Sequence, residues 1–214
     1  LGKKVCVIDP VKGLVTEGGV MESSVNIEAS KQKYAALEED VEAITLMSGF
    51  CGGDANGNLV LLGRNGSDFS ASIVASSLSS SRVEFWTDVD GVYTADPRIV
   101  KDAILVDDMT YEESMELAFF GSKVLHPKTL APLVSKGIEA WSLNSHNPSS
   151  RGTRIGKGPF DSSRKHSICG ISCLKKVSMI SVSGNGMRGR SGMASRIFAS
   201  VSSAGISILL ITQS

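Results

Sequence analysis

Apolar residues fall into short runs that are separated by polar and glycine-rich stretches. Each run is short, and several end at Pro, Gly, Asn or Asp, which favours buried strands. Strands are predicted at residues 3–10, 43–50, 59–63, 82–87 and 138–143, and residues 51–58 are predicted to be a turn-rich hairpin connection.

Helix signals lie between these strands. Ser67 is predicted to cap a helix whose first turn contains Asp68. Thr110 and Glu113 form a capping-box pair that opens a second helix, which ends near residue 121. A third helix is predicted to begin after residue 127 and to end at Gly137. Alternation of strands and helices predicts an α/β fold with a mostly parallel sheet sandwiched by helices.

The last part of the chain has a different pattern. Residues 147–166 are rich in Ser, Gly, Pro and charge, which indicates a boundary or linker. A strand at 177–183, a helix at 191–205 and a strand at 206–212 then form a small unit. Such a unit cannot bury its own faces, so we expect it to need more chain or a partner.

Composition excludes several classes of function. The 22 Lys and Arg residues balance 22 Asp and Glu, so no net charge attracts nucleic acid or anionic membrane. The longest apolar run, 206–211, is too short to span a bilayer, and no leader segment is evident. The four Cys and three His residues lack zinc-site spacing, which predicts free thiols in a cytoplasmic protein without a protein-bound metal.

The stretch WTDVDGVYTADPR, residues 86–98, combines acids, an aromatic ring and an arginine at a strand end. Asp88 follows the carboxyl end of the strand, where open α/β sheets bind ligands. Gly91 permits a sharp turn, and Tyr93 could stack on a base. Lys123 is a candidate phosphate clamp further along the chain. A solvated acidic turn explains the same acids equally well.

The stretch LGRNGSD, residues 62–68, places Arg64 just before a predicted helix start. Backbone N–H groups at a helix start bind anions, and a guanidinium suits a carboxylate or phosphate. An ordinary cap with a surface arginine is the alternative. The glycines of GNGMRG, 184–189, match a dinucleotide fingerprint, but the acid that should follow the next strand is missing. We therefore do not expect a nicotinamide site there.

Taken in order, GF at 49–50, LGRNGSD at 62–68, WTDVDGVYTADPR at 86–98 and FFGSKVLHPKT at 119–129 resemble the aspartokinases of the amino-acid kinase family. GTRIG at 152–156 is similar to the end of their catalytic domain. Residues 186–214 resemble the start of the regulatory ACT domain. Their sequence is most similar to that of the threonine-sensitive bacterial branch, whose members usually continue into homoserine dehydrogenase. The resemblance implies a kinase domain at 1–158, a linker at 159–171 and a partial ACT domain at 172–214.

The resemblance implies ATP-dependent phosphorylation of the β-carboxylate of L-aspartate, with Mg²⁺ carried mainly by the phosphates. NADPH would be a cofactor only if a dehydrogenase domain follows. The phosphoryl-stabilising lysine belongs to a Lys-Phe-Gly-Gly segment that these residues do not contain, so this polypeptide alone is expected to be inactive. By the same resemblance, the nucleotide site is expected at Thr87, Asp88, Tyr93, Arg98, Lys123 and Val124, and the aspartate site at Phe50, Arg64, Ser67 and Asp68.

An effector site is expected between paired ACT units, in a homo-oligomer, with threonine as the inhibitor. Its candidate residues are Met187, Ser191, Gly192 and Gln213. Two alternatives stay open: a kinase for another amino acid, and a fragment that binds an amino acid without catalysis. The central expectation is that Arg64, Asp88 and Lys123 share one cleft.

Overall fold

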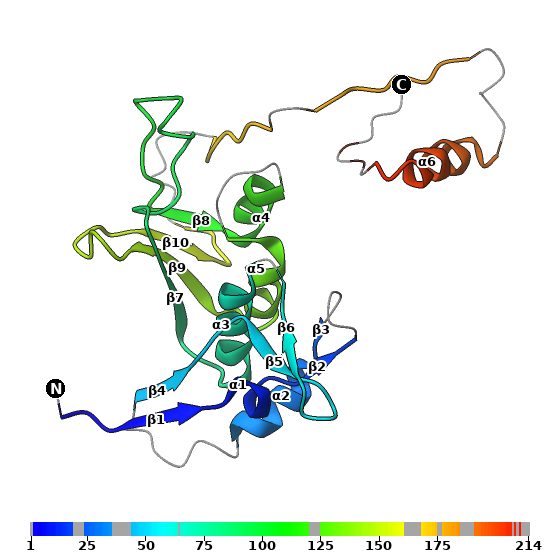
Figure 1. Ribbon diagram of the computed structural model, residues 1–214. Helices are drawn as coiled ribbons and strands as arrows, with labels where there is room; N and C mark the ends of the chain where they lie inside the picture. Colours follow the sequence, from blue (N-terminus) through cyan, green and yellow to red (C-terminus); the bar gives the residue numbers. More distant parts are fainter. Residues whose placement is uncertain are drawn as a thin grey trace. The chain divides into compact units, whose positions relative to one another are not determined.

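The computed structural model (Figure 1) describes residues 2–18, 24–35, 44–63, 65–119, 125–160, 168–174, 177–184, 191–206, 208 and 210. The chain divides into two compact units, Leu1–Leu174 and Lys175–Ser214. Each unit is described by itself.

The main sheet of the first unit has the strand order β7-β9-β10-β8. Strand β7, Arg82–Thr87, pairs in parallel with β9, Glu139–Asn144. Strand β10, Thr153–Gly156, runs antiparallel to β9 and parallel to β8, Asp108–Thr110. The α/β class is therefore confirmed, and the sheet is mixed.

Three helices pack against this sheet and against one another: α3 (Gly66–Ser77), α4 (Tyr111–Phe119) and α5 (Pro127–Val134). Val83 and Phe85 of β7 are buried, whereas the alternate positions of β7 are exposed or half-buried. Among the described residues, helices thus cover one face of the sheet and not both. The core on that face contains Val83, Phe85, Met109, Tyr111, Leu130, Leu133, Ile138, Ala140 and Ile155.

Local chemistry fixes two of the helix starts. In the predicted capping box, the Thr110 N–H donates to Glu113 Oε2 over 2.8 Å and the Glu113 N–H donates to Thr110 Oγ1 over 3.2 Å. His126 caps α5, because its Nδ1 accepts from the Lys128 N–H over 3.1 Å. The predicted third helix is confirmed, but it begins at Pro127 and ends at Val134, before the predicted end at Gly137.

The strands predicted near the start of the chain do form, but the prediction that they are buried is wrong. Strands β1, Val5–Ile8, and β4, Ile44–Met47, do form a parallel pair. However, Val7 is 73% exposed and Leu46 is 58% exposed. A parallel pair buries its apolar side chains only beneath another layer, and no other described element pairs with this sheet.

The predicted hairpin stretch, 51–58, is itself partly strand. Strand β5, Cys51–Gly53, pairs antiparallel with β6, Leu59–Leu61, so the turn lies between these two strands. Asp54 Oδ1 fixes the turn by accepting from the N–H groups of Asn56 and Asn58, each over 2.8 Å. The remaining elements are α1 (Pro10–Gly13), β2 (Thr16–Glu17), β3 (Ser24–Val25) and α2 (Ile27–Ala35).

In the second unit, the predicted helix is confirmed as α6, Met193–Ser203. The two predicted strands are not formed at the described positions, which are 177–184, 206, 208 and 210. Met179 is 92% exposed, and α6 has no buried residue. Without burial of an apolar face, a strand in so small a unit gains little stability.

Candidate functional site

The carboxyl ends of β7 and β9 bring two loops together. Thr87 and Asn144 are the last residues of these parallel strands and are partners in the register. Ser145, in the next position, donates to the Thr87 carbonyl from both its N–H and its hydroxyl, each over 2.9 Å. The loop after β7 is thus hydrogen-bonded to the loop after β9 at the edge where open α/β sheets bind ligands.

Asp90 adds side-chain contacts between the same loops. Its Oδ1 accepts from Asn144 Nδ2 over 2.8 Å and from Asn147 Nδ2 over 3.1 Å. Its Oδ2 accepts from the Tyr93 hydroxyl over 3.4 Å. The amide donors of Asn144 and then Asn147 lower the pKa of Asp90, because they stabilise the charged carboxylate.

A buried hydroxyl anchors the loop that follows β7, residues 88–107, which we call the β7 loop. Thr153, on β10, is fully buried; its Oγ1 accepts from the Val92 N–H over 2.8 Å and donates to the Val106 carbonyl over 2.7 Å. Gly91 has φ of 140°, and a Cβ there would lie 2.5 Å from Thr153 Oγ1. The loop therefore requires glycine at 91 and a hydroxyl at 153.

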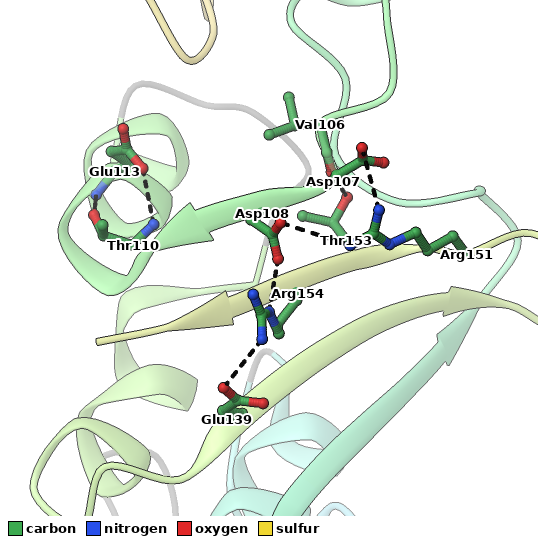
Figure 2. Close-up of polar contacts among 9 residues, drawn as sticks. All are labelled: Val106, Asp107, Asp108, Thr110, Glu113, Glu139, Arg151, Thr153 and Arg154. Carbon is green, nitrogen blue, oxygen red and sulfur yellow. Dashed lines mark hydrogen bonds and ion pairs between the residues drawn. The ribbon is translucent and has the colours of Figure 1, made fainter. Parts of the chain in front are cut away.

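Figure 2 shows the ionic contacts around this anchor. Arg154 Nε donates to Asp108 Oδ1 over 2.6 Å, which joins β10 to β8, and its Nη1 lies 3.7 Å from Glu139 on β9. Arg151 pairs with Asp107 over 3.4 Å. The Arg154 pairs thus join β10 to its two neighbouring strands, and the Arg151 pair joins the segments that precede β10 and β8.

The described residues that are expected to bind the nucleotide lie at the end of β7 and along the β7 loop. Thr87 Oγ1 accepts from the Val89 N–H over 3.2 Å, and Asp88 is exposed. Burial, and then the Asp90 charge, raise the pKa of Tyr93. Arg98 makes a bidentate pair with Asp96, over 2.9 and 2.7 Å. The other two candidates, Lys123 and Val124, lie outside the described residues.

The described residues that are expected to bind the substrate aspartate lie at and near the start of α3. Phe50 has φ of 75° and is 45% exposed. Its N–H donates to Ser70 Oγ over 3.3 Å, and that hydroxyl donates to the Ser67 carbonyl over 2.8 Å. Gly66 allows the close approach, because a Cβ there would lie 2.8 Å from the Phe50 ring. Phe50 is thus held against the first turn of α3.

The prediction that Ser67 caps α3 is wrong. The N-cap is Asn65, a left-handed residue with φ of 55° and no side-chain cap bond, and the helix begins at Gly66. Asp68 stays in the first turn as predicted, where burial raises its pKa and the Ser67 side chain partly opposes the shift. Arg64 lies outside the described residues, and so its place beside Asp88 and Lys123 remains a prediction.

The two groups of candidates lie toward the same end of the unit. Helix α3 packs against β7 and joins it through residues 78–81, so helix and strand run in opposite directions. Helix α3 is about 18 Å long and β7 about 20 Å. The start of α3, with Ser67 and Asp68, therefore lies near the level where β7 ends at Thr87.

Of the effector candidates, two are described. Gly192 is the N-cap of α6, with φ of 78°, and Ser191 precedes it; both are exposed. Met187 and Gln213 lie outside the described residues.

Other features place limits on the site. Within the described residues, no three His, Cys, Asp or Glu side chains gather in a way that could hold a metal ion. None of the described helices is long and apolar enough to cross a membrane.

A hollow of about 360 Å³ between α4 and residues 170–174 contains none of the predicted site residues; Glu116, Leu117, Gly170, Ile171, Ser172 and Leu174 line it.

Four residues of this site were not predicted from the sequence: Asp90, Asn144, Asn147 and Thr153. The rule that pointed to Asp88 could have found the two asparagines, because they follow the carboxyl end of the next parallel strand. No local signal marks Thr153, whose two partners come from distant parts of the chain.

Comparisons with known proteins identify the family of the chain. The family model of the amino acid kinase family matches residues 2–144, and an ACT domain model matches residues 180–214. The chain is 48% identical to a bifunctional aspartokinase/homoserine dehydrogenase of Haemophilus influenzae, over 100% of this chain and 26% of that protein. A Buchnera aphidicola protein of the same name is 42% identical over 98% of this chain and 26% of its own length.

Among solved structures, the chain is similar to E. coli aspartokinase III in complex with aspartate and ADP. The TM-score is 0.73 at 28% identity, over 99% of this chain and 47% of that one. The chain spans about a quarter of the length of the curated relatives named above. By its matched residues, this chain belongs to the amino acid kinase family, and its last part belongs to an ACT domain.

Proposed function

We propose that the protein to which this chain belongs is an aspartokinase, which transfers the γ-phosphoryl group of ATP to the β-carboxylate of L-aspartate. The observation that carries the proposal is the similarity of the whole chain to aspartokinases, and the packing of α3 against β7 supports it. Open α/β sheets bind ligands in the crevice outside the carboxyl ends of their strands.

The proposed chemistry needs alignment more than proton transfer. A β-carboxylate is already ionised at neutral pH, so the attacking oxygen needs no general base. The protein must orient that oxygen toward the γ-phosphorus and offset the charge on the transferring group. Thr87, Asp88 and Tyr93 would hold the nucleoside, while Arg98 and Lys123 would contact phosphate oxygens.

Arg98 can contact phosphate in two ways. Its Nε and Nη2 are engaged by Asp96 in an exposed pair. Such a pair is weak in water. A phosphate could therefore displace Asp96 or bind the remaining nitrogen of the guanidinium.

The proposed aspartate site uses complementary charges at the start of α3. Arg64 would bind the α-carboxylate, and Asp68 would bind the ammonium group directly or through water. Ser67 would add a hydroxyl, and the exposed ring of Phe50 would border the pocket. Mg²⁺ would be carried by the ATP phosphates.

We further propose that the ACT domain binds a free amino acid in a homo-oligomer, with threonine as the inhibitor and Met187, Ser191, Gly192 and Gln213 at its site. A side-chain amide such as Gln213 suits a hydroxylated effector. A solved relative, E. coli aspartokinase III, is described in complex with lysine and aspartate. Inhibition of the intact enzyme by lysine and not threonine would reverse this assignment.

The names of the relatives suggest that a homoserine dehydrogenase domain accompanies the kinase, and NADPH would then be its cofactor. The four free cysteines fit a cytoplasmic location.

Calorimetry of the intact enzyme with Arg64→Ala tests the aspartate site. We expect affinity for aspartate to fall at least about 10-fold, because a charge-assisted carboxylate contact is lost, while affinity for ATP stays within about 2-fold. Arg82→Ala is a matched control, since Arg82 forms an exposed pair with Glu84 at the other end of β7. Equal losses for both ligands in Arg64→Ala would refute the assigned role.

A further inference from the structure

We propose that Asp90 is a positioning residue of the nucleotide loop: its carboxylate fixes the loop after β7 to the loop after β9 and orients Tyr93. The inference rests on the proposed nucleotide site. Asp90 is assigned no contact with ATP, and it acts through the residues around it.

The contacts of Asp90 span distant parts of the chain. One oxygen, Oδ1, accepts from both Asn144 and Asn147, which lie 54 and 57 residues further along. The other oxygen, Oδ2, accepts from the Tyr93 hydroxyl. Oδ1 therefore joins the β7 loop to the loop after β9, and Oδ2 makes a contact within the β7 loop.

The two asparagines are held in the orientation that suits Asp90. Asn144 Oδ1 accepts from the His146 N–H over 2.8 Å, and Asn147 Oδ1 accepts from the Ser149 hydroxyl over 2.8 Å. Because each amide oxygen is engaged elsewhere, each amide nitrogen is turned toward Asp90. Hydrogen bonds to a charged acceptor are about twice as strong as those between neutral groups.

The position of Asp90 links these contacts to the nucleotide. Thr87 and Asp88 precede it by two or three residues, and Tyr93 follows it by three. The loop is hydrogen-bonded to the β9 loop at Thr87 and to Thr153 at Val92, so Asp90 holds the stretch between two backbone anchors. A small displacement of such a stretch misplaces every ligand contact that it makes.

The test measures ADP affinity of the intact enzyme by calorimetry, which does not depend on turnover of aspartate. Asp90→Ala is expected to weaken ADP binding by about 10-fold. Asp90→Asn keeps an Oδ1 acceptor for both amides and is expected to stay within about 3-fold of the wild type. Asp102→Ala, in an exposed position of the same connection, is the control and should bind ADP normally.

Asn147→Ala provides a second variant, should Asp90→Ala fail to fold, because Asn147 is exposed and its loss removes only one of the hydrogen bonds to Asp90, together with the contact to the Ser149 hydroxyl. It should weaken ADP binding less than Asp90→Ala, and combining it with Asp90→Ala should add little further loss. Normal ADP binding in Asp90→Ala, or additive losses in the double variant, would overturn the inference. Failure of the wild type to phosphorylate aspartate would instead refute the proposed substrate and leave this result interpretable.

Discussion

The hydroxyl of Thr153 accepts a hydrogen bond from the backbone N–H of Val92 over 2.8 Å, across 61 residues of sequence. The same hydroxyl donates to the Val106 carbonyl over 2.7 Å (Figure 2). One buried side chain thus satisfies two backbone groups that belong to opposite ends of the connection between β7 and β8.

Thr153→Val keeps the shape of the side chain and removes both bonds. We expect the free energy of unfolding of the first unit to fall by about 2 kcal/mol or more, since a donor and an acceptor are left buried without partners. Thr129→Val is the matched control: the buried Thr129 hydroxyl has no hydrogen-bond partner within the described residues, so its loss should cost little. Denaturant titration of the intact protein measures both, and equal effects would contradict the account.

Gly91→Ala is expected to destabilise the same loop. Its φ of 140° strains any side chain, and the new Cβ would lie 2.5 Å from Thr153 Oγ1 and 3.0 Å from the Thr153 nitrogen. We expect a loss of about 2 kcal/mol or more and weaker ADP binding. Gly57→Ala, at φ of 80° with nothing within 4 Å of its Cβ, should cost only the backbone strain of about 1 kcal/mol.

The raised pKa of Asp68 predicts the direction of a pH effect. Because burial favours the protonated form, Asp68 contributes stability at low pH that is lost as the pH rises through its raised folded-state pKa. Relative to the wild type, Asp68→Asn should therefore gain stability as the pH increases from about 4 to 7. Thermal unfolding of both proteins across this range checks the sign; a constant difference would show that the pKa is not raised.

The same carboxylate should make aspartate binding sensitive to acid. If the ionised form binds the substrate ammonium, the wild-type KM for aspartate should rise on acidification at a pH above the ordinary value of 3.8. Asp68→Asn should have a high KM at neutral pH and change less on acidification. Steady-state kinetics of the intact enzyme would decide, and parallel pH profiles for the two proteins would exclude this role.

The capping box of α4 offers a local test. Thr110→Ala removes the acceptor for the Glu113 N–H and should lower the free energy of unfolding by about 1 kcal/mol. Thr110→Ser keeps the hydroxyl and should cost clearly less. Because Thr110 is at the start of α4 and not among the predicted ligand residues, ADP affinity should stay unchanged in both variants.

Features set by local sequence were the ones that could be predicted. Strand β7 has the predicted bounds, 82–87, because alternating apolar side chains define its buried face. The capping box at Thr110 was found because its two members are three residues apart. The cap of α3 was missed, since the left-handed backbone of Asn65 starts the helix without using the Ser67 hydroxyl.

The rest depends on contacts between distant segments. Strands β8 and β10 are short and become strands by pairing with each other, and β10 also pairs with β9. The cluster of Asp90 with Asn144 and Asn147 exists only because β7 and β9 pair in parallel with Thr87 opposite Asn144. Such a register cannot be obtained from the pattern of either strand alone.

The most direct test of the proposed activity is trapping of the acyl phosphate by hydroxylamine in the intact protein, with ATP, Mg²⁺ and a panel of amino acids. We expect ATP-dependent hydroxamate formation with L-aspartate, and little with glutamate or N-acetylglutamate. Preferential reaction with another acid, or no reaction with aspartate under conditions where ADP binds, would contradict it.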